Sequence, residues 1–315
     1  MPVVTAVRLG RLGDLVMTWP ALATLDDCLL QVVVDTQYVR LVQAALPGAR
    51  VVDSTDDLRP ADAVLDLHGV AASRRVLREV PRLSGAPTFR TPKDSLRRRA
   101  LLLPGSWGPT RSWPRRHAEA VAALRARLEL PSRVAEAPSL DPGAVRPEAG
   151  LLGLVIGAGH ATKRWPAERF ADLSRRWADF GGRVRVFVGP GEADLAEPVL
   201  ATETARRWEE STDRPLLDLA RGLAGCEVVV GGDTGPLHVA GALGRPVVAL
   251  FGPTPVHAGF WVWGDAGRAL SAGADCAPCS MHGARPCRRP RRVCLEDLPA
   301  DVVLHAARAQ AGHPE

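Results

Sequence analysis

Residues 227–254 (EVVVGGDTGPLHVAGALGRPVVALFGPT) constrain the fold more than any other stretch of this 315-residue chain. Two apolar runs flank a glycine turn and a segment of small residues with helical character. Strand, turn, helix and strand in this order predict a βαβ unit with parallel strands. Residues 233–238 (DTGPLH) begin the helix, where free backbone N–H groups and the helix dipole favour an anion, most often a phosphate. A plain capped helix, with Asp233 or Thr234 as the N-cap, is the alternative.

Similar units of strand, loop and helix run through the rest of the chain. Apolar runs predict strands at 3–7, 31–35, 63–67, 151–156, 184–188, 227–230 and 247–251. Periodicity predicts helices over about 15–25, 38–46, 93–103, 117–128 and 299–311. We expect the apolar side of the helix at 93–103 to consist of Leu96, Ala100, Leu101 and Leu103. In the second half each apolar run ends in glycine, which indicates a parallel sheet with helices on both faces.

The pattern predicts an α/β protein made of two Rossmann-like, doubly wound parallel-sheet domains that face a cleft. Residues 131–150 are rich in proline and lack periodicity, as an interdomain linker would. We expect an N-terminal domain over 1–145 and a C-terminal domain over 146–298. Residues 299–315 are expected to form a terminal helix, with packing back on the N-terminal domain as one option.

Composition limits the class of protein. Apolar content of 46% and charged content of 24% are typical of a soluble globular protein. No apolar run approaches the ~20 residues of a membrane helix, and the N-terminus lacks the features of a secretory signal, so we expect a cytoplasmic protein. Between Arg90 and Arg133 lie eleven basic residues and three acidic ones. This segment is either a patch for a phosphate-bearing partner or a solvated arginine-rich surface.

Six cysteines include a cluster with the spacing C-x2-C-x7-C-x6-C. In a cytoplasmic chain such residues are thiols or metal ligands rather than disulfides. One C-x2-C pair is a good zinc half-site, but the second pair lacks this spacing. Two alternatives therefore stay open, free thiols or a structural zinc held by Cys276, Cys279, Cys287 and Cys294. Cys28 and Cys226 lie in apolar contexts and are expected in the core.

Two more loops of the second half are suited to phosphate chemistry. Residues 157–166 (GAGHATKRWP) follow a strand, and their glycines let the backbone approach a phosphate, while Lys163 adds a positive charge. The spacing of a Walker A loop is absent. Glu192 follows the next strand and either accepts hydrogen bonds from ribose hydroxyls or stabilises a helix start. Together with 233–238, these loops predict a nucleotide-diphosphate pocket.

In the first half, Gly13 and Asp14 open the helix after the first strand. The G-x-G-x-x-G pattern is missing, which argues against a dinucleotide-dependent oxidoreductase. Asp14 is either a plain N-cap or a general base that takes a proton from an attacking hydroxyl. No Ser-His-Asp pattern is evident, and the spacing of the histidines does not support a metal site.

At these residues the chain resembles glycosyltransferase family 9, the ADP-heptose:lipopolysaccharide heptosyltransferases, nearly from end to end. Its N-terminal signature appears as Arg8, Gly13, Asp14, Pro20 and Leu25. The segment Lys163-Arg164-Trp165-Pro166 is similar to the family's Lys-x-Trp-Pro, and the most specific motif is 233–238 with Pro246, Phe251, Gly252 and Thr254. The chain departs from the pattern at His68-Gly69, where many relatives have Gln-Gly, and at 157–163, which lacks a run of hydroxyl residues.

The resemblance implies a GT-B fold with an N-terminal acceptor domain and a C-terminal nucleotide-sugar domain. It implies inverting transfer of a heptose, or a similar sugar, from an ADP-sugar to the inner core of lipopolysaccharide, with no required cofactor or metal. Carried over by position, the catalytic residues are Asp14, the general base, and Lys163. The donor site comprises Gly157, Thr162, Lys163, Glu192, Asp233, Thr234, Gly235 and His238. The acceptor site comprises Arg8, Gly13, His68, Lys93, Arg97 and Arg98.

The expected partners are thus a nucleotide-sugar donor and a lipid-linked anionic glycan. The arginines near residue 97 would also suit peripheral contact with the anionic inner-membrane surface. Two other functions compete: a nucleotide-sugar epimerase or hydrolase, and a non-enzymatic basic module that binds nucleic acid. The first needs a second acid near the sugar, and none is obvious beside Asp14. The second would favour aromatic stacking surfaces, yet aromatic content is only 5%, so we expect no nucleic-acid partner.

Overall fold

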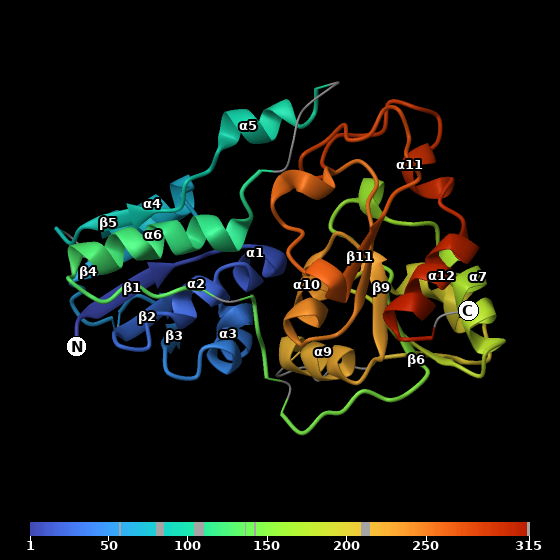
Figure 1. Ribbon diagram of the computed structural model, residues 1–315, viewed down its shortest axis with the longest axis horizontal. Coiled ribbons are helices and arrows are strands. Elements are labelled where there is room, and N and C mark those ends of the chain that lie inside the picture. Colours follow the sequence, from blue (N-terminus) through green and yellow to red (C-terminus); the bar gives the residue numbers. More distant parts are fainter. Residues whose placement is uncertain are drawn as a thin grey trace. The chain divides into compact units, whose positions relative to one another are not determined.

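The computed structural model describes residues 1–56, 58–79, 85–103, 110–135, 137–141, 143–208 and 215–313. Its contacts divide the chain into two compact units, each an α/β structure around one parallel sheet (Figure 1). Unit 1 comprises Met1–Asp94 and Arg111–Asp141, and unit 2 comprises Ser95–Thr110 and Pro142–Glu315. The stretch 131–150 contains no helix or strand in its described part, and residues 136 and 142 of the expected linker lie outside the described residues.

Unit 1 contains a five-stranded sheet in the order β3-β2-β1-β4-β5. The strands are β1 (Val3–Val7), β2 (Leu29–Val33), β3 (Arg50–Val52), β4 (Ala63–Asp66) and β5 (Thr88–Arg90). The helices are α1 (Leu12–Val16), α2 (Trp19–Ala23), α3 (Val39–Ala45), α4 (Ala71–Glu79) and α6 (Trp113–Arg127), with a 3₁₀ turn η1 (Thr36–Tyr38). The helix expected over 15–25 is divided, because Pro20 cannot continue the backbone hydrogen bonds of α1 and instead lies in the first turn of α2.

The strand order of unit 1 reverses between β1 and β4. The chain runs outward from β1 through β2 to β3 and then returns to pair β4 with the other side of β1, with Val7 opposite Asp66. Loops that leave two parallel strands at such a reversal separate to opposite faces of the sheet and open a crevice at its carboxyl edge. A ligand site of unit 1 is therefore expected at the loops after β1 and β4.

Unit 2 contains a six-stranded parallel sheet in the order β11-β10-β9-β6-β7-β8, which reverses between β6 and β9. The strands are β6 (Leu151–Val155), β7 (Arg183–Phe187), β8 (Ala205–Arg207), β9 (Val228–Gly232), β10 (Val247–Leu250) and β11 (Gly267–Leu270). The helices are α5 (Ser95–Ala100), α7 (Ala167–Ala178), α8 (Glu197–Leu200), α9 (Pro215–Ala224), α10 (Gly235–Ala242), α11 (Val293–Glu296) and α12 (Ala300–Gln310). The 3₁₀ turns are η3 (Ala161–Lys163), η4 (Ala193–Ala196), η5 (Val256–Ala258) and η6 (Gly264–Ala266).

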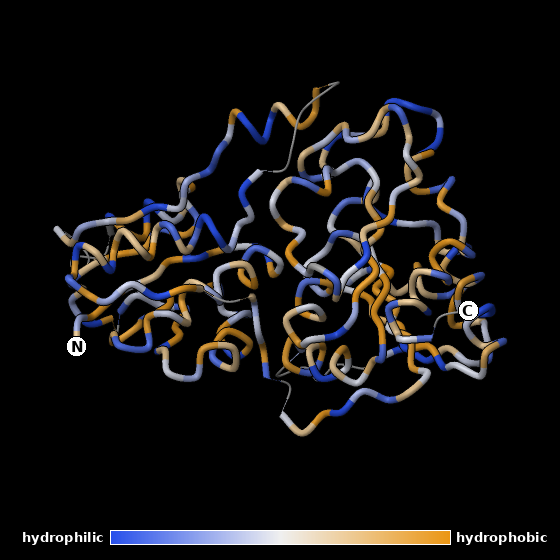
Figure 2. Tube along the Cα trace, in the orientation of Figure 1, coloured by the Kyte–Doolittle hydropathy of each residue, from blue (hydrophilic) through white to orange (hydrophobic). Residues whose placement is uncertain are grey.

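Helices cover both faces of the sheet in unit 2. Helices α7 and α12 pack against one another on one face, while α9 and α10 pack together on the other (Figure 1). The strands between them carry the most continuous hydrophobic stretches of the unit (Figure 2), which is typical of a parallel sheet buried on both faces. Ala300, Val303 and Ala307 of α12 lie in the core cluster of this unit. Helix α12 therefore packs on α7 and the second sheet within unit 2, and the expected domain bounds stay a prediction.

The arginine-rich segment near residue 97 differs from its prediction. Its helix is only α5, and Leu96 and Leu103 are 83% and 63% exposed, so the expected apolar side is wrong for these two leucines, whereas Leu101 is buried. The helix cannot begin earlier, because Asp94 has a φ of 47°, outside the right-handed helical region.

The basic segment 90–133 is only partly a surface. Arg116 and Arg125 on α6 are fully buried, and their guanidinium groups donate to backbone carbonyls and pair with Asp94 and Asp27. Buried charges need such partners to offset the loss of hydration. These two arginines therefore hold α6 in place and do not belong to a patch that could attract nucleic acid. In the described part of the chain, no helix has the length and apolar character that crossing a membrane requires.

We predict that His117 makes unit 1 sensitive to acid. Its ring is buried and shares a 2.8 Å hydrogen bond with Thr91, and burial, followed by the charges of Arg8 and Arg116, holds its pKa well below the ordinary 6.5. Because the folded pKa lies below the unfolded one, this contribution to stability is complete above pH 6.5 and is lost as the pH falls below it. The loss approaches about 1.4 kcal/mol per pH unit. Urea denaturation between about pH 7.5 and 5.5 measures it.

The variant His117→Gln should flatten this dependence, whereas His305→Gln, at an exposed position on α12, should leave it unchanged. An equal pH slope in the His117→Gln variant and the unaltered protein would show that another group controls acid unfolding.

Candidate active site

The strongest candidate site lies where the strand order of unit 2 reverses. Lys163 ends the 3₁₀ turn η3 in the loop after β6, and Asp233 directly follows β9, the neighbouring strand. Lys163 Nζ lies 2.7 Å from Asp233 Oδ2, and both side chains are 15% exposed. Two of the loops predicted from sequence to share a phosphate site are thus joined by an ion pair.

Asp233 is the centre of a polar cluster. Its Oδ2 atom also accepts a hydrogen bond of 3.3 Å from the hydroxyl of Thr254, which follows β10, and its Oδ1 atom lies 3.6 Å from His238 Nε2. Burial opposes ionisation of this carboxyl, but His238 and the Lys163 ammonium outweigh it, so the pKa of Asp233 lies below its ordinary value. Asp233 is therefore ionised at neutral pH and holds Lys163 in one place.

The helix start after Asp233 has no side-chain cap. Thr234 is the N-cap of α10, but its side chain makes no capping hydrogen bond and instead donates to the Gly232 carbonyl at 3.3 Å. Pro236 lies in the first turn, where a missing N–H costs nothing. The alternative of a plain N-cap is therefore right about the position of Thr234 but not about its side chain.

His238, on the first turns of α10, is buried rather than open to solvent. It is 5% exposed, and its ring lies about 6 Å, centroid to centroid, from Trp263 and Phe260. Among the described residues no hydrogen-bond partner reaches its Nδ1 atom. The structure thus places His238 beside the carboxylate of Asp233, with one ring nitrogen unused.

The loop that carries Lys163 is anchored by its two following residues. The Trp165 side chain is buried, donates from Nε1 to the Leu298 carbonyl at 3.1 Å and packs edge-on against Phe170. Arg164 donates from Nη2 to the Ala158 carbonyl and to Glu192 Oε1, both at 2.9 Å. The segment Lys-Arg-Trp-Pro is therefore a rigid support that fixes where the lysine leaves the backbone.

Glu192 is bound to the backbone of the same region. Its Oε1 atom accepts from the Ala158 N–H at 3.1 Å, and its Oε2 atom accepts from the Gly189 N–H at 3.0 Å. It is the N-cap residue of η4 but makes no capping hydrogen bond, so the helix-start alternative stays open. A Cβ atom at Gly157 would lie 1.7 Å from Glu192 Oε2, so the glycine is needed to admit this carboxylate. The ribose assignment of Glu192 stays a prediction.

A second charged cluster lies at the strand reversal of unit 1. Arg8, directly after β1, is 6% exposed and donates from Nη1 to the Leu67 carbonyl at 2.9 Å. Its Nη2 atom lies 2.9 Å from Asp14 Oδ2, on α1. Asp66, at the end of β4, is fully buried and accepts from the Gly69 N–H at 2.7 Å. Arg8 thus orients Asp14, the candidate base, against the adjacent loop.

Lys93 and His68 belong to the same cluster. Lys93 Nζ donates to the Gly69 carbonyl at 2.8 Å. The His68 ring packs against Gly10, since a Cβ atom placed on this glycine would lie 3.4 Å from His68 Cε1. Burial, and then the positive charge of Arg8, lowers the pKa of His68 below its ordinary value, so the imidazole is neutral at pH 7. A neutral imidazole can both donate and accept a hydrogen bond.

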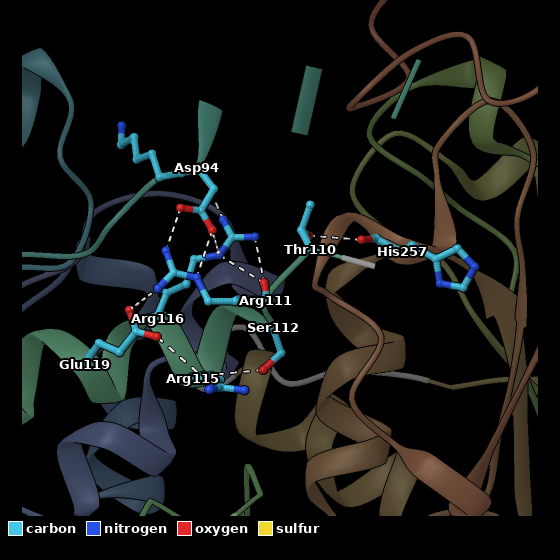
Figure 3. A network of polar contacts seen from close by, with 9 residues as sticks. Asp94, Thr110, Arg111, Ser112, Arg115, Arg116, Glu119 and His257 are labelled. Atoms are coloured by element: carbon cyan, nitrogen blue, oxygen red, sulfur yellow. Dashed lines mark hydrogen bonds and ion pairs between the residues drawn. The ribbon is translucent and has the colours of Figure 1, made fainter. Parts of the chain in front are cut away.

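Figure 3 shows a network of polar contacts around Asp94, which also holds the backbone of Lys93. Arg111 binds the Asp94 carboxylate through two hydrogen bonds of 2.6 and 3.0 Å and reaches Glu119 at 2.6 Å. Arg116 donates from Nη1 to the Lys93 carbonyl at 3.1 Å and lies 3.6 Å from Asp94. These bonds stabilise the unusual φ of Asp94 and so fix the position of Lys93.

The remaining predicted acceptor residues are Arg97, Arg98 and Gly13. Arg97 and Arg98 lie on α5, which belongs by its contacts to unit 2, whereas Arg8, Gly13, His68 and Lys93 belong to unit 1. The acceptor role of the two arginines therefore stays a prediction, as does that of Gly13, which lies within α1.

The cysteines near the C-terminus form no disulfide, and burial, followed by the neighbouring thiols, raises the pKa of Cys294 to about 11. Within the described ranges, no group of three or more His, Cys, Asp or Glu side chains is placed to hold a metal ion. Cys28 and Cys226 are buried, which confirms the prediction that both lie in the core.

Sequence reasoning missed four residues that shape the Lys163 loop. Arg164 lies in the segment 163–166 and Thr254 in the motif that begins at Asp233, so both could have been found from the sequence as polar members of these motifs. Gly283 and Arg292 lie in the cysteine-rich segment and carry no signal in sequence, because their role depends on contacts with residues more than a hundred positions away.

A family model described as glycosyltransferase family 9 (heptosyltransferase) matches residues 124–285, just over half of the chain. The chain belongs to glycosyltransferase family 9. This match contains the Lys163 loop and the 233–238 motif, which confirms the resemblance deduced from those residues. Lipopolysaccharide heptosyltransferase 2 of Escherichia coli K12 is 35% identical over 112 residues, which is 34% of this chain and 32% of that protein. The aligned part thus spans about a third of this curated relative.

Solved structures show the same fold over nearly the whole chain. The Escherichia coli ADP-heptose lipopolysaccharide heptosyltransferase II matches with a TM-score of 0.69 and 19% identity, covering 98% of both chains. An Escherichia coli heptosyltransferase solved with ADP matches with a TM-score of 0.67 and 19% identity over 98% of this chain and 99% of the other. With its two parallel-sheet units, the family 9 chain has the predicted GT-B fold.

We predict that Gly157 cannot be enlarged. The variant Gly157→Ala should lose about 1–3 kcal/mol of stability, because the added methyl group must displace the Glu192 carboxylate and its bonds to two loop amides. Thermal unfolding and denaturant titration measure this loss.

Gly159→Ala is the matched control, because a Cβ at this position of the same loop meets no atom within 4 Å. Equal stability of the two variants would contradict the close packing of Glu192 against Gly157.

Proposed function

We propose that this protein is an inverting glycosyltransferase that moves a heptose, or a similar sugar, from an ADP-sugar to an anionic lipid-linked glycan. The observation that carries the proposal is the Lys163–Asp233 pair beside the N-terminus of α10, at the strand reversal of unit 2. Ligands of open α/β sheets bind at such reversals, and helix N-termini favour phosphate groups.

On the donor side, unit 2 would bind the diphosphate and stabilise it as a leaving group. The Lys163 ammonium and the backbone N–H groups at Thr234, Gly235 and Leu237 neutralise the charge that develops when the glycosidic bond breaks. Asp233 holds Lys163 in place, and its carboxylate would accept hydrogen bonds from sugar hydroxyls. A solved neighbour of the same fold contains ADP, which supports adenine as the base of the nucleotide.

On the acceptor side, unit 1 would supply the base. The acceptor hydroxyl gives its proton to the Asp14 carboxylate as its oxygen attacks the anomeric carbon, and the bond from that carbon to the diphosphate breaks with inversion. Arg8 orients the carboxylate through their 2.9 Å contact. Lys93, fixed by the Asp94 network, offers a positive charge to an acceptor that carries carboxylates or phosphates.

The exposed face of α5 suits peripheral contact with an anionic membrane surface. Leu96 and Leu103 are two of the large hydrophobic side chains that the described chain exposes most, and they flank the run Arg97, Arg98 and Arg99. Apolar side chains that enter the headgroup region and arginines that bind anionic lipid act together in interfacial segments. Such a contact would bring the enzyme to a lipid-anchored acceptor.

The substitution Asp14→Asn should lower kcat by about 10²–10⁴ and leave ADP affinity within a few-fold, because a general base acts on the acceptor and not on the nucleotide. Product formation from an ADP-sugar and calorimetry with ADP measure the two effects. Asp53→Asn, at an exposed position of the same unit, is the control and should behave like the unaltered protein. Near-normal turnover of the Asp14→Asn variant would exclude Asp14 as the base.

Removal of charge from α5 should weaken membrane binding selectively. The double variant Arg97→Gln/Arg99→Gln should reduce co-sedimentation with phosphatidylglycerol vesicles by roughly 25-fold, at about 1 kcal/mol for each arginine, with no effect on weak binding to phosphatidylcholine. Leu96→Ser should reduce binding to phosphatidylglycerol as well.

Arg175→Gln is the control for charge, because this arginine lies on α7 and is 61% exposed. If it weakened vesicle binding as much as loss of the α5 arginines, net charge rather than α5 would account for the attraction.

A further inference from the structure

The cysteine-rich segment 276–294 contacts the Lys163 loop at two points. The Thr162 hydroxyl donates a hydrogen bond to the Gly283 carbonyl, and Arg292 donates to the carbonyls of Ala161 and Arg164. Arg292 is itself held by Glu296, whose Oε1 atom accepts from its Nε at 3.2 Å. The segment therefore binds the backbone on both sides of Lys163.

Gly283 lies directly against the lysine side chain. A Cβ atom at this position would lie 2.6 Å from Lys163 Cγ and 2.8 Å from its Cδ. The φ of Gly283 is +79°, in the left-handed region that residues with a Cβ rarely adopt. Glycine is thus required both by the backbone and by the lysine stem that fills the space beside it.

The place of Gly283 is set by the same elements that hold the lysine ammonium. Its N–H donates to Ser280 Oγ at 3.0 Å, and the N–H of Ser280 donates to the Pro253 carbonyl at 3.0 Å. The residue after Pro253 is Thr254, whose hydroxyl donates to the Asp233 oxygen that binds Lys163 Nζ. One connected set of contacts therefore fixes both the stem and the charged end of the lysine.

We propose that residues 280–283 form a clasp that positions Lys163 on the diphosphate of the donor, and that Gly283 is a positioning residue of this site. The inference rests on the proposed function of Lys163. A free lysine side chain has many rotamers, and fixing it before the ligand arrives removes the entropy that binding would otherwise cost. The clasp thus raises affinity for the nucleotide without touching it.

Calorimetry on the full chain with ADP tests the clasp. Gly283→Ala should weaken ADP binding by about 5–30-fold, because the added methyl group displaces the lysine stem. Gly273→Ala is the matched control: this glycine also has a positive φ, +70°, but a Cβ there meets nothing within 4 Å. It should change ADP affinity by less than about two-fold.

A second pair of variants avoids backbone strain. Ser280→Ala removes the oxygen that accepts the Gly283 N–H and should weaken ADP binding in the same direction. Ser271→Ala removes the equivalent contact to the Gly273 N–H, at 3.4 Å, and should have no effect. Melting temperatures of all variants report on folding, so the serine pair decides the question if Gly283→Ala does not fold.

A double-mutant cycle separates positioning from a general loss of structure. If the clasp acts through Lys163, Gly283→Ala should have no further effect on ADP affinity in a Lys163→Ala background. In turnover assays the same substitution should raise the KM for the donor and leave the KM for the acceptor unchanged. An equal loss of ADP affinity with and without Lys163 would overturn the proposal, as would normal ADP binding by both Gly283→Ala and Ser280→Ala.

The outcomes distinguish failure of the clasp from failure of the proposed function. If Lys163→Ala leaves ADP, UDP and GDP binding unchanged, the lysine is not in the donor site, and both proposals fall. If Lys163→Ala weakens ADP binding while the Gly283 and Ser280 variants do not, only the clasp is overturned.

Discussion

Parallel pairing of β1 with β4 and of β6 with β9 is the constraint on which both candidate sites depend. In each sheet the strand order reverses at this pair, so the loops that follow the two strands meet at one carboxyl edge. In unit 2 this brings Lys163 to Asp233, and in unit 1 it brings Arg8, which binds Asp14, to the Leu67 carbonyl after β4. The charged groups are placed by the sheets, and the ion pairs then fix their orientation.

The two clusters use charge in different ways. Lys163 and Asp233 are both 15% exposed, so the pair is shielded enough to be ordered yet open enough to meet a ligand. Arg8 is nearly buried and bound to a carbonyl, so it serves as a fixed support for Asp14, which keeps 27% of its side-chain surface exposed. A rigid cation beneath a partly exposed carboxylate is what a positioned base requires.

Much of the fold could be predicted because apolar runs and glycines carry it locally. The seven predicted strands exist in the structure within a residue or two at each end, and the motif at 233–238 does open a helix at a strand end. The three-residue edge strands β3, β5 and β8 were not predicted, because so short a strand leaves almost no pattern in the sequence. The break between α1 and α2 was not predicted either. The exposure of Leu96 and Leu103 was not predicted either, because helical periodicity does not indicate whether another element of the fold covers the apolar side of a helix.

The sequence by itself determined the family, the parallel α/β architecture and the residues that could carry charge at each strand end. It could do so because strand length, glycine turns and helix starts depend on neighbouring residues. Only the tertiary structure decided that Asp233 binds Lys163 and that the Glu192 carboxylate accepts hydrogen bonds from loop amides. It also decided that Arg116 is buried and that Gly283 lies against the Lys163 side chain. These contacts join residues far apart in the chain, and such pairings are fixed by sheet order and close packing, which no local pattern records.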